Sequence, residues 1–353
     1  MRHRYVRSSS VIAESAAALL SLRPVTGRHR GCRRRALESC DMPAAPDHRV
    51  RTRTWAPEGP YDLGRTLGVL RRGPGDPAYR VADGAIWRAS RTPAGPGTLR
   101  VAPAGGAVAA EAWGPGADWL LDGLPALLGA KDDPGPFTPR HRVVHEARRR
   151  HPGLRLIRTG LVLESLIPSV LEQKVTTDEA YRSWRLLLHR YGTPAPGPAG
   201  AGLRMRVMPD AHGWAMIPSW EWHRAGVDGK RAAAIVRAVR RARALQAAAD
   251  MDLDAAVRRL TAIPGIGPWT AAETLQRVNG AADAVTVGDL HLPRIVGYTL
   301  AGERDADDAR MLELLAPYET GGQRHRATRY ICLLGRMPPR RKPKAAIPDI
   351  ARL

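Results

Sequence analysis

The stretch Leu260–Asp289 decides how this chain folds. It reads L-T-A-I-P-G-I-G-P-W-T-A-A-E-T-L-Q over residues 260–276 and ends in V-T-V-G-D at residues 285–289. The helical spacing of apolar residues continues up to about Thr261, and I-P-G-I-G then predicts a tight hairpin. A second helix is expected to begin near Pro268, because proline suits the first position of a helix.

This hairpin is suited to binding a phosphate. Gly265 and Gly267 carry no side chains, so the backbone through Ile266 can approach a phosphate closely. The N–H groups at the start of the second helix have no partners within it and favour an anion. Thr270 lies in that first turn, where its hydroxyl is expected to bind the phosphate, while Ile263 and Ile266 pack inward. Such a hairpin holds DNA backbone without reading sequence; the alternative is that the glycines serve only a tight turn.

The segment resembles the helix-hairpin-helix and Gly/Pro…Asp signature of base-excision DNA glycosylases, most closely that of 3-methyladenine DNA glycosylase II. In that family an aspartate lies a helix and a loop beyond the hairpin, and Gly288-Asp289 occupies that place here. The resemblance implies that Asp289 is the catalytic group and faces the sugar of the flipped nucleotide. The alternative is that Asp289 only caps the helix that follows, since aspartate is a favoured N-cap residue.

The same resemblance assigns two residues of the second helix to a base pocket. Trp269 holds a position that borders the pocket in the family, and an indole face attracts a cationic base. Glu273 lies one helical turn further on the same face, where the family prototype has an aromatic residue. We expect Glu273 to contact the flipped base or to restrict the substrate range. Trp269 is alternatively an ordinary core aromatic.

A second region resembles the beginning of the family's helical domain. It reads H-P-G-L-R-L at residues 151–156 and L-I-P-S-V-L-E-Q-K-V-T-T at residues 166–177. In the family the turn here carries the residue that wedges into the gap left by the flipped base. That position is Lys174, after Gln173, and both residues are expected to contact DNA. The family prototype has an apolar wedge, so Lys174 is a departure, although its aliphatic stem also fills space; a solvated surface charge is the alternative.

These features predict a DNA glycosylase that excises alkylated purines of the 3-methyladenine type in base-excision repair. A base inside a duplex must first be rotated out, and breaking its N-glycosidic bond builds positive charge on the sugar, which a carboxylate stabilises. Family members that also cut the strand carry a lysine at the position of Trp269, so the resemblance implies a monofunctional enzyme that leaves an abasic site. Two rivals stay open: a non-catalytic helix-hairpin-helix DNA-binding protein, and a glycosylase for oxidised or deaminated bases.

Composition agrees with a nucleic-acid partner. Lys and Arg number 55 against 34 Asp and Glu, and the net charge of +21 favours a polyanion such as double-stranded DNA containing a damaged base. The abundance of Ala, Gly, Pro and Arg is also typical of a high-GC coding sequence, which accounts for part of the arginine excess. No apolar run is long enough to span a membrane, and the resemblance implies a monomer.

Cofactors are not expected, apart from one structural ion. The three cysteines, Cys32, Cys40 and Cys332, are too few for an iron–sulfur cluster and indicate a reduced, cytoplasmic, nucleoid-associated chain. No catalytic metal is needed for the predicted reaction. The resemblance implies at most a Na⁺ or K⁺ bound by hairpin carbonyls, those of Thr261, Ile263 and Ile266.

The pattern along the chain predicts a mostly α protein with a smaller α+β domain before the helical one. The expected divisions are a disordered basic tail over 1–48, with Met42 as an alternative start, an α+β domain over 49–135, a helix-hairpin-helix glycosylase domain over 136–338 and a basic tail over 339–353. Alternating or β-forming residues predict strands at 85–90, 98–101 and 107–113. Helical spacing predicts helices at 61–70, 117–128, 141–150, 162–173, 177–191, 229–249 and 253–261.

Overall fold

Residues 49–339 are described by the computed structural model, and the predictions for the two tails, including the Met42 start, lie outside them. The first part of this range forms a five-stranded antiparallel sheet in the order β1-β5-β4-β3-β2. Its strands are β1 (Arg51–Trp55), β2 (Tyr79–Ala82), β3 (Ala85–Thr92), β4 (Gly95–Ala104) and β5 (Ala107–Trp113). The three predicted strands are confirmed as β3, β4 and β5. The two edge strands were not predicted, because β1 is mostly polar and exposed and β2 spans only four residues.

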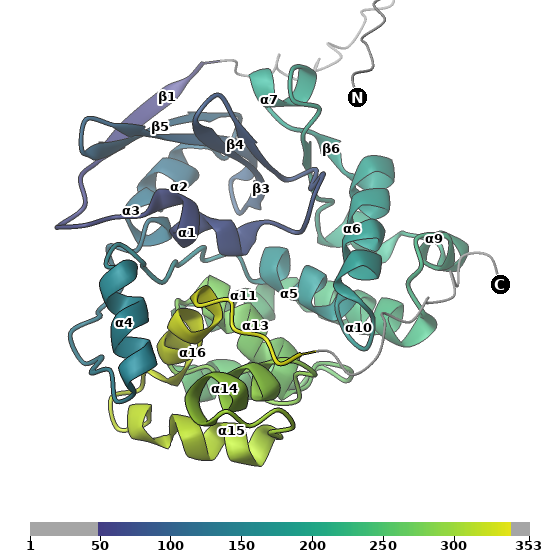
Figure 1. The fold of residues 1–353 in the computed structure, drawn as a ribbon. Helices are drawn as coiled ribbons and strands as arrows, with labels where there is room; N and C mark the ends of the chain where they lie inside the picture. The colour runs from purple at the N-terminus through teal and green to yellow at the C-terminus, as the bar shows by residue number, and fades with distance from the viewer. Residues whose placement is uncertain (1–48, 340–353) are drawn as a thin grey trace, which may run out of the picture. The chain divides into compact units, whose positions relative to one another are not determined.

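Short helices cover one face of the sheet (Figure 1). They are α1 (Leu63–Leu67), the 3-10 helix η1 (Gly68–Leu70), α2 (Ala117–Asp122) and α3 (Leu124–Leu127). Leu120 and Leu124 pack there with Leu99 and Val101 of β4 in one apolar core. The alternation of apolar residues along β4 and β5 places one row of side chains against these helices, which explains the position of the core.

The rest of the described chain is helical, as predicted. The longer helices are α4 (Arg142–Arg150), α5 (Val162–Leu171), α6 (Thr177–Tyr191), α10 (Gly229–Arg240), α12 (Leu253–Thr261), α13 (Pro268–Val278), α14 (Leu292–Ala301), α15 (Asp308–Leu315) and α16 (Arg324–Leu333). The shorter elements are β6 (Thr193–Pro194), α7 (Pro198–Ala201), β7 (Arg206–Val207), α8 (Ala211–Ala215), α9 (Ser219–Arg224), α11 (Ala242–Gln246), η2 (Ala247–Asp250) and η3 (Ala316–Tyr318). Within residues 49–339 no helix combines the length and apolarity required to cross a bilayer.

The predicted helix 229–249 is interrupted. Its backbone leaves the helical region at Arg241 (φ −112°, ψ 20°), so that α10, α11 and η2 follow one another. The break allows Leu245 to enter the core beside α5 and allows the Gln246 amide to donate to the carbonyl of Gly160. Tertiary contacts therefore override a periodicity that is compatible with one long helix.

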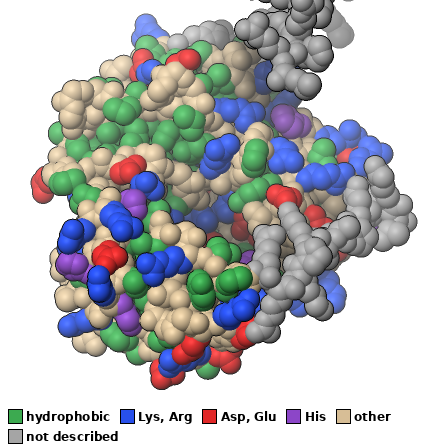
Figure 2. Space-filling model, viewed as in Figure 1, with side chains coloured by type: hydrophobic (Ala, Val, Ile, Leu, Met, Phe, Trp, Pro, Cys, Tyr) green, Lys and Arg blue, Asp and Glu red, His purple; other side chains and the backbone are tan. Residues whose placement is uncertain are grey.

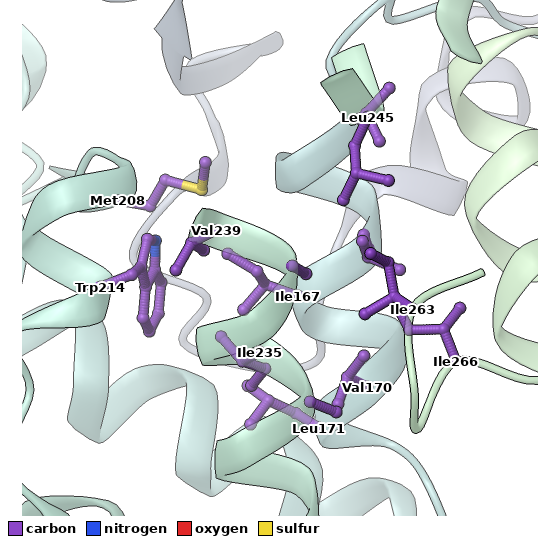
Figure 3. Close-up of a cluster of buried hydrophobic side chains, with 14 of the residues drawn as sticks. Ile167, Val170, Leu171, Met208, Trp214, Ile235, Val239, Leu245, Ile263 and Ile266 are labelled. Atoms are coloured by element: carbon purple, nitrogen blue, oxygen red, sulfur yellow. The ribbon is translucent and has the colours of Figure 1, made fainter. Parts of the chain in front are cut away.

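The hairpin between α12 and α13 is anchored in the largest apolar core. Ile263 and Ile266 are buried, and they lie against Ile167 and Val170 of α5 and near Ile235 of α10 (Figure 3). The expectation that both isoleucines pack inward is therefore confirmed. Because the two side chains point into the core, the backbone between them is held at the surface.

Buried ion pairs connect the sheet and its flanking segments to the helices. Arg88 of β3 pairs with Glu164 of α5, and Arg72 pairs with Glu172 at 2.9 Å. Asp132 pairs with Arg326 of α16, with one N–O distance of 3.0 Å and side chains only 2 % and 0 % exposed. The segment 132–139 contains no helix or strand, as expected of a connection, but it is packed into the structure through this pair.

We predict that Arg326→Met lowers the free energy of unfolding by about 3–5 kcal/mol, because it leaves the Asp132 carboxylate buried without its cation. Arg142→Met is the matched control, since Arg142 forms an exposed pair with Glu146 within α4. Loss of the Arg142–Glu146 pair should lower the free energy of unfolding by no more than about 0.5 kcal/mol. Urea unfolding of both variants measures the difference, and equal costs would contradict the assignment.

Candidate active site

The hairpin presents unpaired backbone donors to solvent. The Ile266 N–H donates to the Ile263 carbonyl at 3.0 Å. Within the described residues, the N–H groups of Gly265, Gly267 and Trp269 have no hydrogen-bond acceptor. Three free N–H groups around the start of an eleven-residue helix form an arrangement suited to a phosphate oxygen.

A side chain from the turn after α5 and one from α10 hold the hairpin carbonyls. The Gln173 amide donates to the Gly265 carbonyl at 3.0 Å, and Arg237 of α10 donates to the Pro264 carbonyl at 2.8 Å. In the peptide that joins Pro264 to Gly265, the N–H lies opposite the carbonyl that Arg237 binds, so the free Gly265 N–H points away from that side chain. The hairpin is thus held in place by contacts that the sequence pattern did not reveal.

The two hairpin glycines are needed for different reasons. Gly265 has φ +96°, and a Cβ there would lie 2.8 Å from the Ala234 Cβ, so both conformation and packing require glycine. Gly267 has φ −97°, and a Cβ there would meet no atom within 4 Å. The geometry of the turn therefore requires glycine at position 265 but not at position 267, where the absence of a side chain leaves open space on the outer surface.

Thr270 does not lie where its hydroxyl would reach a phosphate. Its side chain is 2 % exposed and accepts a hydrogen bond from the Gln173 amide at 2.7 Å. The residue falls on the inner face of α13, since the first turn of a helix presents only part of its circumference to solvent. Gln173, expected to contact DNA, likewise uses its amide N–H groups to fasten the hairpin to the end of α5.

Lys174 lies at the predicted turn between α5 and α6. It is exposed, and its φ of +54° places it in the left-handed region that non-glycine residues seldom adopt. The turn ends where Thr176 begins α6 with a capping box to Glu179. Lys174 thus projects from a tight, capped turn, and its entry into a DNA gap stays a prediction.

Asp289 is bound by three N–H donors. Its Oδ1 accepts from the backbone N–H groups of His291 (2.7 Å) and Leu292 (2.8 Å), and its Oδ2 accepts from the Trp269 indole at 3.0 Å. Asp289 thus stabilises the start of α14 without being its N-cap residue, which is His291: Oδ1 accepts from the N–H groups of His291 and of the first helical residue, Leu292. This contact uses one oxygen only, and Oδ2 keeps a lone pair on a half-exposed carboxylate.

The loop before Asp289 is held by a second aspartate. The Gly288 N–H donates to both carboxylate oxygens of Asp308, at 3.1 and 3.0 Å, from the first turn of α15. Gly288 has φ +87°, a conformation that favours glycine. Asp308 therefore helps to set the direction in which the Asp289 side chain leaves the backbone. Sequence reasoning missed it, because its position nineteen residues later gives no periodic signal.

The predicted pocket residues of α13 lie near this carboxylate. Trp269 is partly exposed and contacts Asp289 directly, so it is not an ordinary core aromatic. Glu273 uses both carboxylate oxygens: Oε1 accepts from the Thr286 hydroxyl at 2.9 Å, and Oε2 pairs with Arg277 at 2.8 Å. Burial alone would lower the pKa of Arg277, but Glu273 beside it raises that pKa overall. The negative charge of Glu273 is thus neutralised by Arg277, and its side chain lines one side of the site.

Polar groups of α16 complete the surroundings, and sequence reasoning missed these as well. His325, Arg329 and Cys332 follow one another at helical spacing and face the same region as Glu273 and Arg277. Burial lowers the pKa of His325 well below its usual value, with help from Arg329 and Arg277, so the imidazole is neutral. Figure 2 shows further Lys and Arg side chains gathered over α4.

The carbonyls expected to bind a monovalent ion fit that role by their chemistry. Within the described residues, the carbonyls of Thr261 and Ile266 accept no hydrogen bond, while that of Ile263 accepts one. Unpaired backbone oxygens are suitable ligands for a hard cation. The same part of the chain holds no group of three or more His, Cys, Asp or Glu side chains arranged for a metal.

Comparison with solved structures identifies the fold. The 3-methyladenine DNA glycosylase of Archaeoglobus fulgidus is 16 % identical and superposes with a TM-score of 0.65, over 79 % of this chain and 97 % of that protein. MBOgg1, solved with a low-affinity DNA ligand, is 16 % identical, with a TM-score of 0.63 over 83 % and 99 % of the two chains. The 8-oxoguanine glycosylase/lyase of Clostridium acetobutylicum, solved with double-stranded DNA, is 12 % identical, with a TM-score of 0.60 over 77 % and 90 %.

These structures confirm the predicted fold. The described chain has the helix-hairpin-helix DNA glycosylase fold, mostly α with a small antiparallel sheet toward its N-terminal side. No model of a known protein family matches the sequence, and no curated protein is similar to it in sequence. At these identities the likeness concerns the fold, and activity must be argued from the site.

The two glycines provide a matched test of the phosphate site. Gly267→Ala should leave the unfolding free energy within about 0.5 kcal/mol of the parent. Its methyl group would occupy the open space in which a phosphate is expected, and binding to duplex DNA should weaken roughly tenfold, since one charge-assisted contact is worth about 1.5 kcal/mol. Gly265→Ala should instead destabilise the protein by about 2–4 kcal/mol through strain and collision with Ala234. Thermal unfolding and fluorescence-anisotropy titration separate the two effects. Unchanged DNA affinity of Gly267→Ala would remove the hairpin from the DNA interface.

Proposed function

We propose that this protein is a monofunctional DNA glycosylase that excises alkylated purines by hydrolysis of the N-glycosidic bond. One observation carries the proposal: a carboxylate, Asp289, is fixed by three N–H donors beside a hairpin whose Gly265 and Gly267 N–H groups have no acceptor in the described chain. A protein that only binds DNA requires the hairpin but has no need for an oriented carboxylate next to it.

The residues have distinct roles in this reaction. The hairpin binds a backbone phosphate through Gly265 and Gly267 and so fixes the DNA in register. The target nucleotide is rotated out of the duplex, and the base leaves C1′ of the sugar with the bonding electron pair. Asp289 Oδ2 stabilises the positive charge that develops on the sugar and orients the water that adds to C1′. The hydroxyl of the water stays on the sugar, and its proton is released.

The side chains around Asp289 support the finer assignment. Trp269 occupies the position that carries lysine in strand-cutting relatives, and an indole cannot form the Schiff base that strand cutting requires. Its aromatic face favours an electron-poor alkylated ring. The partner is double-stranded DNA with one flipped nucleotide, bound by a single copy of the protein. Lys174 enters the gap left by that nucleotide, and Na⁺ or K⁺ on the hairpin carbonyls would stiffen the phosphate site.

Asp289→Asn tests the catalytic role separately from capping. The asparagine Oδ1 still accepts from His291 and Leu292, so α14 stays capped. Its Nδ2 faces the Trp269 indole N–H, and with the charge gone excision should fall by at least roughly 10²–10³-fold. Base release from methylated duplex DNA, resolved by chromatography, measures the rate beside the parent protein. Binding to the same duplex should remain, and near-normal excision by the variant would refute the mechanism.

Asp308→Ala tests whether the second aspartate positions Asp289. The Gly288 N–H loses its carboxylate acceptor, and we expect the single-turnover excision rate to fall roughly tenfold, because misplacement of a catalytic group is costly. DNA affinity should be unchanged, since Asp308 is not assigned to the DNA surface.

Asp307→Ala is the matched control for Asp308. Asp307 caps α15 by accepting from the Arg310 N–H at 2.9 Å but has no contact with Gly288. The Asp307→Ala variant should lose about 1 kcal/mol of its free energy of unfolding and should keep the excision rate of the parent protein. Equal rate losses in the two variants would indicate that α15 as a whole, not the Asp308 contact, supports the site.

A further inference from the structure

Two rows of side chains face one another beside Asp289 and form what we name the α13–α16 slot. One row consists of Trp269, Glu273 and Arg277, spaced four residues apart on α13; the other consists of His325, Arg329 and Cys332 on α16. The electrostatic neighbours of Cys332 are Arg329, Asp289 and Glu273, and those of Arg329 include Arg277 and Glu273. The rows therefore run side by side, with Cys332 beside Asp289 and His325 beside Arg277.

The slot opens near Asp289 and closes at a small cavity. Cys332 is exposed to solvent, and yet burial raises the pKa of its thiol. Cys332 thus marks the end of the α16 row that is open to solvent. At the other end, a cavity of about 30 Å³ is lined by Gln276, Arg277, His325 and Arg329 together with Val69, Arg155, Leu156 and Ile157. Since Cys332 has both Asp289 and Arg329 as electrostatic neighbours, a flat ring held between the two rows would lie between these two groups.

Most polar groups in the slot already have partners. Glu273 binds Thr286 and Arg277, and Arg277 also donates to the Val69 carbonyl at 3.1 Å. His325 is neutral because burial lowers its pKa. Glu273 and Arg277 thus offer few free hydrogen-bonding atoms, whereas the neutral His325 ring keeps one donor and one acceptor nitrogen without a partner in the described chain.

Arg329 is the one cation of the slot that lacks an acceptor for a buried N–H. Its Nε is buried and has no hydrogen-bond partner in the described chain, and its only bond there is a long one, 3.4 Å, from a terminal nitrogen to the Arg65 carbonyl. No carboxylate within residues 49–339 forms an ion pair with it. Burial, followed by repulsion from Arg277, lowers its pKa to about 10, so it is still a cation at neutral pH. A buried donor without an acceptor is costly to the fold and is a mark of a ligand contact.

We propose that Arg329 reads the flipped base by donating a hydrogen bond to a carbonyl oxygen at purine position 6, so that the slot prefers 6-oxopurines over 6-aminopurines. This inference rests on the proposed glycosylase function and names the substrate class of the same site. A guanidinium only donates, so it binds a carbonyl oxygen and opposes an amino group. Arginine and the O6 edge of guanine are a common pair in nucleic-acid recognition for this reason. Hypoxanthine and 7-methylguanine carry the oxygen; 3-methyladenine carries an amino group.

The release of two bases from one DNA sample tests the preference. DNA treated with dimethyl sulfate contains both 7-methylguanine and 3-methyladenine, and their release ratio, corrected for content, is independent of enzyme concentration. Repulsion between Arg329 and a cationic base applies to both and cancels in the ratio. Arg329→Met should lower the ratio of 7-methylguanine to 3-methyladenine roughly tenfold, the effect of one lost base contact. Arg329→Lys should restore part of it.

A second substrate and a control variant complete the experiment. A duplex with a single hypoxanthine should be cleaved to an abasic site by the parent protein, and Arg329→Met should reduce that rate roughly tenfold. Arg324→Met is the control on the same helix, since Arg324 pairs with Asp283 at 2.5 Å. It should leave the ratio unchanged. Melting temperature and affinity for an abasic-site duplex report whether each variant is folded.

The outcomes separate the two proposals. Release of methylpurines with a ratio that Arg329→Met leaves within twofold would overturn the role of Arg329 and keep the glycosylase function. An equal change of the release ratio in Arg324→Met would also overturn the role of Arg329, because the effect would then come from a general disturbance of α16. Release of neither methylpurine nor hypoxanthine by the parent protein would overturn both proposals. Loss of 7-methylguanine and hypoxanthine release alone, in a folded Arg329→Met variant, is the supporting result.

Discussion

Three hydrogen bonds to one carboxylate hold the candidate site together. Two come from the start of α14 and one comes from the Trp269 indole at the start of α13, so Asp289 joins two helix beginnings that are separated by a loop. Neither helix alone fixes the direction of the side chain. The cap aligns Oδ1 with the axis of α14, and the indole then determines where Oδ2 points. The orientation that a catalytic carboxylate needs is therefore a by-product of ordinary helix capping together with a single aromatic donor.

Helix α13 carries the other parts of the site because of its position. Its beginning supplies the free N–H groups of the hairpin, and its buried face packs on α5 through residues such as Ala271 and Leu275. A third face presents Trp269, Glu273 and Arg277 in successive turns. Since the spacing of the helix sets the distances along that face, Trp269, Glu273 and Arg277 keep fixed separations from the free N–H groups at its beginning. The isoleucines of the hairpin fix the same helix against the core, which explains why packing and chemistry meet here.

The local parts of this arrangement could be predicted from sequence. The hairpin, the helices on either side of it and the burial of Ile263 and Ile266 follow from periodicity, proline placement and glycine conformation. What could not be predicted depends on contacts between distant segments. Thr270 is directed inward because the end of α5 lies against it, and Asp308 reaches Gly288 only through the packing of α14 on α15. No spacing rule connects α16 with α13, so Arg329 gave no signal.

The charges of the slot suggest why its two ends differ. Glu273 and Arg277 neutralise each other, as do Arg72 and Glu172 nearby, and within the described residues neither Asp289 nor Arg329 forms an ion pair. An unmatched anion thus lies at the mouth of the slot and an unmatched cation lies further in. When the N-glycosidic bond breaks, the sugar becomes positive and the departing base gains the bonding electrons. Under the proposed function, Asp289 stabilises the positive charge on the sugar and Arg329 stabilises the electrons gained by the departing base. Such fixed groups act strongly because they need no reorganisation during the reaction. The contribution of Arg329 should be largest for neutral bases, since a cationic purine already accommodates those electrons.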